Sequence, residues 1–189
     1  MGIKCSVFIA TSLDGYIARR DGGLDWLPGS DGPTSDGTAS DGAGAEDHGY
    51  AEFYAAIDTL VMGRHTYELV RTFKPWPYSG KRVVVLSSAY PKMPMALAQD
   101  VEGTSESPRD LVQRLEASGA AHVYVDGGKT IQSFLNAGLI QELTITRVPV
   151  LIGEGIPLFG PLAHDIKLLH QATRAYANGL VQSTYRVGT

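Results

Sequence analysis

Three short segments of this sequence carry residue types that can bind a phosphate group. They are residues 63–67 (GRHTY), 86–88 (LSS) and 126–130 (DGGKT). Glycine lets the backbone approach a ligand closely, arginine can donate two parallel hydrogen bonds to a phosphate, and hydroxyl groups add further donors. Taken alone, each segment also has an ordinary explanation: a helix cap beside a surface arginine, a pair of loop serines, and a tight connection followed by a solvated lysine.

The three segments share a position at the end of a predicted strand. Apolar runs lead into them at 59–62, 82–86 and 121–125, and helical patterns follow the first and last at 66–72 and 129–137. In an open α/β sheet, ligands bind at the carboxyl ends of the strands, where a helix N-terminus offers free N–H groups. Together the segments predict a site for a small phosphate-bearing molecule, although the usual dinucleotide and P-loop glycine motifs are absent.

The elements around these segments alternate between strands and helices. Further strands are predicted at 3–10, 143–150, 166–175 and 180–187, and further helices at 47–57 and 108–118. This order predicts an α/β fold with a mostly parallel central sheet and helices on both faces. Asn178 and Gly179 predict a closing hairpin that adds antiparallel strands at one edge of the sheet.

We expect a single domain that spans residues 1–189. Residues 29–49 are rich in Gly, Ser, Asp and Thr and contain almost no side chain that could join a core, so they predict a long flexible loop within that domain. Two roles are open for this loop. It is either a lid that becomes ordered over bound ligands or a passive surface insertion.

Composition and charge argue against several classes of protein. The formal net charge is −4 and there is no basic run, which argues against nucleic acid as a partner. Cys5 is the sole cysteine and is expected to be a buried strand residue. No His/Cys cluster has the spacing of a metal site, and no apolar run is long enough to span a bilayer. We therefore expect a cytoplasmic protein that holds no metal and does not enter the membrane.

Five motifs occur in the order in which a known family has them. They are TSLDGYIA (11–18), GRHTYE (63–68), VVLSS (84–88), VDGG (125–128) and PVLIGEGIPLF (149–159). Over nearly its whole length the chain resembles the C-terminal reductase domain of the riboflavin-biosynthesis deaminase-reductases and the stand-alone proteins built from it. More distantly, it is similar to dihydrofolate reductase. The resemblance implies a dihydrofolate-reductase-like fold and NADPH as cofactor.

The resemblance also implies which residues hold NADPH. These positions are Ile9, Ala10, Ile17, Gly63, Arg64, His65, Thr66, Leu86, Ser87, Ser88, Gly127, Gly128, Lys129 and Thr130. The isoleucines and the alanine would flank the nicotinamide, and the double-glycine segment would wrap the pyrophosphate. The serine pair would lie near the adenosine ribose and its 2′-phosphate. Because Arg64 and the serines can donate to a 2′-phosphate, we expect a preference for NADPH over NADH.

Two carboxyl groups are candidates for proton transfer. Reduction of a C=N bond places a hydride on carbon and a proton on nitrogen, and a carboxyl group can supply that proton. Asp14 belongs, by resemblance, to the loop that closes over the reactive centre. Asp47 precedes the first predicted helix, in a sequence position like that of the pocket acid of dihydrofolate reductase. Each also has an ordinary alternative, because Asp is common in turns and at helix N-termini.

Departures from the family pattern leave two functions open. The zinc-binding motifs of the deaminase half are missing, which excludes zinc-dependent deamination, and Tyr16 replaces the lysine of the family's SLDGK loop. The first function is an NADPH-dependent reductase that transfers hydride to a small heterocyclic or imine substrate, such as a pyrimidine or a pterin. It would resemble 5-amino-6-(5-phosphoribosylamino)uracil reductase or dihydrofolate reductase. The alternative is a non-catalytic nucleotide- or pterin-binding protein on the same fold.

A homodimer is expected for either function. The C-terminal strands at 166–175 and 180–187 carry apolar side chains that need cover, and the family tends to pair.

Overall fold

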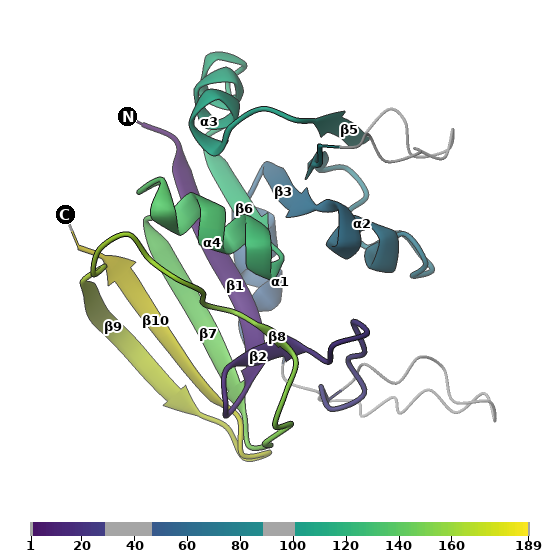
Figure 1. Ribbon diagram of the computed structural model, residues 1–189, viewed down its shortest axis with the longest axis vertical. Coiled ribbons are helices and arrows are strands. Elements are labelled where there is room, and N and C mark those ends of the chain that lie inside the picture. Colours follow the sequence, from purple (N-terminus) through teal and green to yellow (C-terminus); the bar gives the residue numbers. More distant parts are fainter. Residues whose placement is uncertain (1, 29–46, 89–100, 189) are drawn as a thin grey trace.

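An eight-stranded sheet is the centre of the computed structural model, which describes residues 2–28, 47–88 and 101–188. From edge to edge the order is β5 (Val101–Thr104), β4 (Arg82–Leu86), β3 (Thr59–Gly63), β6 (His122–Asp126), β1 (Lys4–Ser12), β7 (Glu142–Val148), β10 (Val181–Val187) and β9 (Leu168–Ala175) (Figure 1). The strands from β5 to β7 run parallel, whereas β10 is antiparallel to both of its neighbours. The predicted mostly parallel sheet with an antiparallel hairpin at one edge is confirmed.

Helices cover both faces of this sheet, as the alternating order predicted. They are α1 (Tyr50–Ala56), α2 (Arg64–Val70), α3 (Pro108–Ala117) and α4 (Gly128–Asn136). Leu60 and Met62 of β3 face α1 and α2, while Val61 between them packs with α3 and α4. Because neighbouring side chains of a strand point to opposite faces, the continuous apolar run of β3 supplies both hydrophobic layers.

Three short strands were not predicted from the sequence. One is β5, and the others are β2 (Tyr16–Ala18) and β8 (Ile156–Pro157), which pair with each other as a small antiparallel sheet. β2 and β8 have only a few residues each and come from opposite halves of the chain. Their pairing depends on the tertiary fold, so local sequence patterns do not reveal it.

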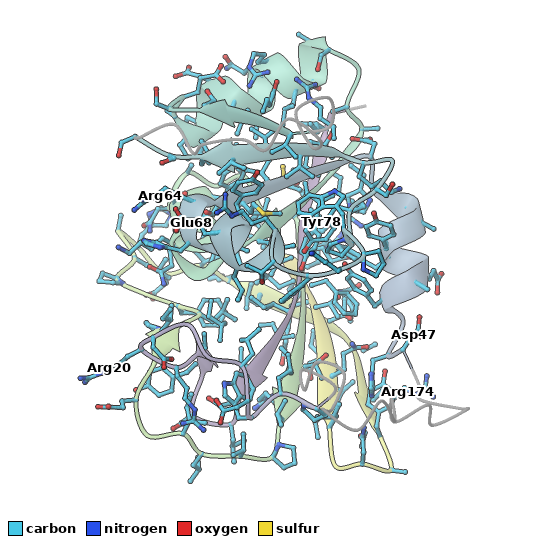
Figure 2. All side chains as sticks on the ribbon, turned by 90° about the vertical axis from the view of Figure 1, so that its right-hand side faces the viewer. Arg20, Asp47, Arg64, Glu68, Tyr78 and Arg174 are labelled. Carbon is cyan, nitrogen blue, oxygen red and sulfur yellow. The ribbon has the colours of Figure 1, made fainter. Side chains whose placement is uncertain are left out.

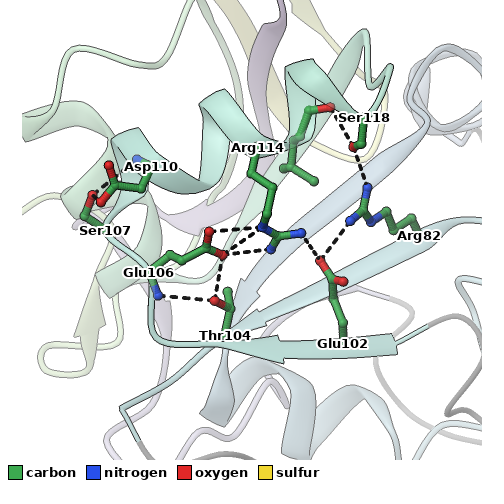
Figure 3. A network of polar contacts seen from close by, with 9 residues as sticks. Arg82, Glu102, Thr104, Glu106, Ser107, Asp110, Arg114 and Ser118 are labelled. Atoms are coloured by element: carbon green, nitrogen blue, oxygen red, sulfur yellow. Dashed lines mark hydrogen bonds and ion pairs between the residues drawn. The ribbon is translucent and has the colours of Figure 1, made fainter.

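A network of ion pairs holds the edge strand β5 against α3 (Figure 3). Arg114 of α3 donates to Glu106 at 2.8 Å and to Glu102 at 3.0 Å, and Arg82 of β4 reaches the same Glu102 carboxylate at 3.1 Å. The hydrogen bonds from Arg114 are the main reason that the pKa of Glu106 lies below its usual value. These contacts explain how the sequence VEGT, which contains a glycine and a glutamate, becomes a strand.

Replacing Arg114 by methionine is expected to lower the free energy of unfolding by about 1–2 kcal/mol, because Glu102 and Glu106 lose their shared partner. The three side chains are about one third exposed, at 37%, 39% and 31%, so salt should weaken the effect. Urea unfolding at low and high salt measures it. Arg109→Met is the matched control, since Arg109 lies exposed on the same helix. Equal losses in the two variants would contradict a role for the network.

Several local predictions are confirmed. The Ser107 hydroxyl accepts a hydrogen bond from the Asp110 N–H at 3.2 Å and caps α3. Gly138 follows α4 with a φ of 69°, as expected of a helix-ending glycine. Cys5 is 1% exposed, and burial raises the pKa of its thiol to about 12.

Part of the predicted loop cannot be compared with the structure. Residues 29–46, and with them the lid hypothesis, lie outside the described residues. Among the helices that are described, none is long and apolar enough to cross a membrane.

Candidate functional site

The carboxyl ends of β3, β4 and β6 bring the three predicted phosphate-binding segments together. Gly63, at the end of β3, pairs with Leu86 of β4, and Met62 pairs with Asp126 of β6. Because these strands are parallel neighbours, the segments that follow them leave the sheet at the same edge. The fold thus gathers glycines and hydroxyls that are far apart in the sequence.

The two glycine turns at this edge fit into each other. A side chain at Gly127 would meet the Thr66 hydroxyl, and a Cβ at Gly63 would lie 3.0 Å from the Thr130 hydroxyl. Gly127 also has φ 88° and ψ 135°, a combination that residues with a side chain rarely adopt. Position 127 therefore requires glycine, and at position 63 a side chain would crowd the Thr130 hydroxyl. Each places a threonine hydroxyl against the backbone of the other, which forms a cradle suited to a pyrophosphate.

The small sheet of β2 and β8 covers the start of α4. A Cβ at Gly128 would lie 3.0 Å from the Pro157 carbonyl oxygen and 3.1 Å from the Ile17 Cδ1 atom. Ile17, one of the residues expected beside the nicotinamide, therefore contacts the glycine turn. Ile9 and Ala10 of β1 are half-buried and pack with different hydrophobic clusters, so they cannot contact a ring from the same face of the sheet.

The basic residues of the turns lie at the surface. The Arg64 guanidinium is 3.6 Å from the Glu68 carboxylate, and the two side chains lie together on α2 (Figure 2). His65 is 3.7 Å from the same carboxylate with a side chain 80% exposed, and Lys129 is also exposed. A pair at this distance is weak, so Arg64 can exchange Glu68 for a phosphate at little cost.

The serine pair follows β4 at the same edge. The Ser87 N–H donates to the Thr104 carbonyl oxygen at 2.9 Å, which continues the pairing of β4 with β5. Leu86 and Ser87 are half-buried, whereas Ser88 is exposed. The hydroxyl of Ser88 is thus accessible to a ligand that extends from the glycine cradle toward β4.

Asp14 holds two loops together at the surface. Its carboxylate accepts hydrogen bonds from the backbone N–H groups of Ile152 at 3.3 Å and Gly153 at 2.8 Å. A hydrogen bond with the Ser12 hydroxyl, followed by these backbone bonds, lowers the pKa of the carboxyl below its usual value. The carboxylate is thus occupied by contacts that join residues 12–14 to residues 152–153. The geometry suits Asp14 to positioning its loop, and its role as proton donor stays a prediction.

Asp47 caps the first helix instead of entering a pocket. Its carboxylate accepts from the backbone N–H groups of Ala51 at 2.8 Å and Gly49 at 3.0 Å, and these bonds lower the pKa of the carboxyl. Figure 2 places Asp47 and Arg64 on opposite sides of the molecule. The ordinary explanation of Asp47, an acid at a helix N-terminus, matches this geometry better than a role as the pocket acid.

Asp126 is half-buried, in contrast to the exposed carboxyl groups of Asp14 and Asp47. It ends β6 directly before the glycine turn. Burial raises the pKa of Asp126 to about 6, against the opposing effect of a 2.7 Å hydrogen bond from the Gly127 N–H. Burial and the charge of Asp126 together raise the pKa of Tyr50 to about 12. A carboxyl that is shielded from bulk water yet partly exposed can hold a proton near neutral pH.

Tyr50, Tyr78 and Tyr124 lie near Asp126: burial raises the pKa of each hydroxyl, and the charge of Asp126 adds to this effect. Further rings pack around Tyr50. Phe8 of β1 packs against Tyr50 and Phe53 of α1, with ring centroids 5.6 Å and 4.9 Å apart. Tyr54 stacks on Tyr50 at 5.8 Å. Within the described ranges, no group of three or more His, Cys, Asp or Glu side chains is placed to hold a metal ion. The site therefore offers a cradle of glycines and hydroxyls beside a carboxyl in aromatic surroundings.

Comparison with known proteins agrees with this geometry. Residues 4–182 match the RibD C-terminal domain. The chain belongs to the RibD C-terminal domain family. It is 33% identical to the YwjB protein of Bacillus subtilis (strain 168) over 181 residues, which cover 94% of each chain. A crystal structure from Shewanella sp. PV-4, of a protein whose name refers to riboflavin biosynthesis, shares 38% identity with a TM-score of 0.86 and covers 99% of this chain and 100% of that one.

A more distant structure shows the fold of this RibD C-terminal domain protein in a longer chain. It is the diaminohydroxyphosphoribosylaminopyrimidine deaminase/5-amino-6-(5-phosphoribosylamino)uracil reductase of Thermotoga maritima, at 14% identity and a TM-score of 0.68. The match covers 98% of the present chain but 57% of the Thermotoga protein. The fold is therefore dihydrofolate-reductase-like, as the five motifs implied.

The sequence contained a signal for Asp126 that was not used. In a strand, residues two apart point to the same face, so Asp126 lies in phase with Tyr124 on the side that α1 covers. An acid in phase with a buried tyrosine, at the end of an otherwise apolar strand, marks a desolvated carboxyl. The two glycines that follow Asp126 indicate a turn more strongly than they indicate a buried carboxyl.

Proposed function

We propose that this RibD C-terminal domain protein is an NADPH-dependent reductase of a small heterocyclic or imine substrate, such as a pyrimidine or a pterin. The observation that carries the proposal is the pair of interlocked glycine turns at Gly63 and Gly127. Each turn packs so closely against a threonine hydroxyl of the other that a side chain in place of its glycine would crowd that hydroxyl. Family membership supports this choice of cofactor and reaction.

The residues of the turns fit a dinucleotide with an extra phosphate. Gly127, Gly128 and Thr130 lie at the start of α4, where the helix dipole favours a pyrophosphate. Arg64 and Ser88 lie exposed on either side and can donate to a 2′-phosphate. When bound, NADPH would supply the hydride. The protein's own groups orient the cofactor and provide the proton.

Asp126 is our candidate for the proton donor, in place of Asp14 and Asp47. With a hydride delivered to the carbon of a C=N bond, the Asp126 carboxyl would give its O–H proton to the nitrogen. The resulting carboxylate then takes a proton from water. A carboxyl with a pKa of about 6 is suited to this cycle near neutral pH, because it is protonated often enough to act and readily gives the proton up.

Calorimetric titration with NADPH and NADH tests the proposal. We expect Arg64→Ala to weaken NADPH binding by about tenfold or more and NADH binding much less, because one charge-assisted phosphate contact is lost. Arg71→Ala is the control, since Arg71 caps the other end of α2. Absence of NADPH binding by the unmodified protein would refute the reductase proposal. Equal losses for the two cofactors would show that Arg64 does not read the 2′-phosphate.

One observation favours the non-catalytic alternative. Tyr16, which replaces the family lysine, lies in β2 and pairs with Pro157, so this position offers no cation to a substrate phosphate. A binding protein would take up NADPH or a pterin without oxidising NADPH against any member of a broad panel of pyrimidines and pterins. Oxidation with any one of them would exclude this alternative.

We also propose that two copies associate through β9. This strand lies at the edge of the sheet, all eight of its residues are exposed, and Leu168 and Leu169 are among them. An edge strand presents unpaired N–H and C=O groups that favour pairing with another chain. Multi-angle light scattering is expected to give about 40 kDa, twice the chain mass of 20.2 kDa. A mass of one chain at micromolar concentration would contradict pairing.

A further inference from the structure

A cleft separate from the glycine turns lies over the face of β7 and β10. Its volume is about 260 Å³, and its apolar walls include Leu13, Ile145, Leu158, Phe159 and Leu168. The sheet forms its floor, and the chain that runs from β8 to β9 passes over it (Figure 1). Ile145 packs with the α3 and α4 side of the sheet, whereas Asp126 faces α1. The cleft therefore opens on the face of the sheet opposite Asp126, and its lining contains none of the glycine-turn residues.

Arg147 of β7 is the charged residue that lines this cleft. It is exposed and makes no side-chain hydrogen bond or ion pair with any of the described residues. The other polar groups of the lining are the hydroxyls of Thr11, Ser183 and Tyr185, and no lining residue is acidic. A guanidinium is weakly hydrated and binds a carboxylate through two parallel hydrogen bonds. One free positive charge beside apolar walls is complementary to one negative charge on an apolar body.

We propose that this cleft is a second ligand site, which binds a small apolar monoanion such as an aromatic or branched-chain carboxylate. The carboxylate would pair with Arg147, and the hydrocarbon part would contact Ile145, Phe159 and Leu168. A cavity of about 150 Å³ holds benzene, so a cleft of about 260 Å³ admits a single ring. Leu13 and Gly15 also line the cleft. They flank Asp14, so a bound ligand contacts the loop that this residue fixes.

Three probes of nearly identical shape test the charge and the place of binding. Benzoate, benzamide and benzamidine carry a negative, zero and positive charge on the same ring. In methyl-resolved NMR titrations of the full chain, we expect benzoate to shift the Ile145, Leu158 and Leu168 signals and to bind at least about tenfold more tightly than benzamide, because only benzoate forms a charge-assisted pair. Benzamidine should cause no shift at these methyl groups.

Two matched variants locate the charge. Arg147→Gln should bring benzoate affinity down to that of benzamide. Arg186→Gln, which removes an exposed arginine from β10, should leave benzoate binding unchanged. Thermal melts of both variants establish that they are folded. The proposal is overturned if benzoate causes no shift at the cleft, if benzoate and benzamide bind alike, or if the two arginine variants behave alike. It is also overturned if a second copy covers the cleft and shields these methyl groups from every probe.

Discussion

Replacing Asp126 by asparagine is expected to lower turnover by about 100-fold or more while NADPH affinity stays unchanged, because the variant loses a proton donor and keeps the glycine cradle. If the unmodified protein is the proposed reductase, its turnover should fall as pH rises through about 6, the value to which burial raises the pKa of Asp126. The variant should lack this dependence. Both are measured as kcat against pH with the first substrate that a panel of pyrimidines and pterins identifies.

The same substitution has an effect on stability that needs no substrate. The pKa of Asp126 is about 6 in the folded protein and 3.8 in the reference state, so the folded state holds the proton more strongly. The associated stability is fully present below pH 4 and is lost as pH rises through about 6. This contribution of Asp126 to the free energy of unfolding is roughly 1–3 kcal/mol. Asp126→Asn should therefore melt at a higher temperature than the unmodified protein at pH 8, and the difference should vanish near pH 4.

The variant Asp47→Asn tests whether Asp47, in place of Asp126, is the proton donor. The Asp47 carboxylate is exposed and bonded to backbone N–H groups at the start of α1, so the variant should keep its turnover and its pH profile. If Asp47→Asn lost turnover and Asp126→Asn did not, the assignment of the proton donor would be reversed. If the melting temperature of Asp126→Asn followed the unmodified protein at every pH, the raised pKa would be refuted.

The fold could be predicted where local pattern and tertiary fold agree. β3, β4 and β6 are continuous apolar runs, and a strand covered on both faces has that pattern wherever it occurs. α3 begins after Ser107 because that side chain satisfies a backbone N–H in any context. The sequence pattern does not predict β5, because VEGT has little strand propensity by itself. Pairing with β4 and the ion pairs of Arg114 stabilise it, and neither is visible in a local window.

The site could be predicted only in part, for a similar reason. A glycine turn between a strand and a helix is local, so Gly63 and Gly127 were identified without knowing that Thr66 and Thr130 cross between them. The state of a carboxyl is not local, because it depends on what covers it. Asp47 has the sequence context of a pocket acid and lies exposed. Asp126 has the context of a turn, and α1, more than 60 residues earlier in the chain, supplies the aromatic surroundings that keep its proton.

Replacing Gly127 by alanine is expected to weaken NADPH binding by about 100-fold or more. The new Cβ would meet the Thr66 hydroxyl, so either Thr66 or the turn must move, and the N–H groups proposed to bind the pyrophosphate would lose their alignment. The backbone at φ 88° and ψ 135° adds strain of roughly 1–3 kcal/mol, which should also lower the melting temperature. Calorimetry with NADPH measures the first effect, and thermal melts measure the second.

Gly138→Ala distinguishes a broken cradle from general destabilisation. Gly138 lies at the other end of the same helix, also has a positive φ of 69°, and has nothing near its Cβ position. This variant should lose stability by roughly 1 kcal/mol and keep its affinity for NADPH. Combining Gly127→Ala with Thr66→Ala should restore part of the lost affinity, because the smaller side chain makes room for the Cβ. Equal NADPH affinities of the two single-glycine variants would show that the interlocked turns are not the cofactor site.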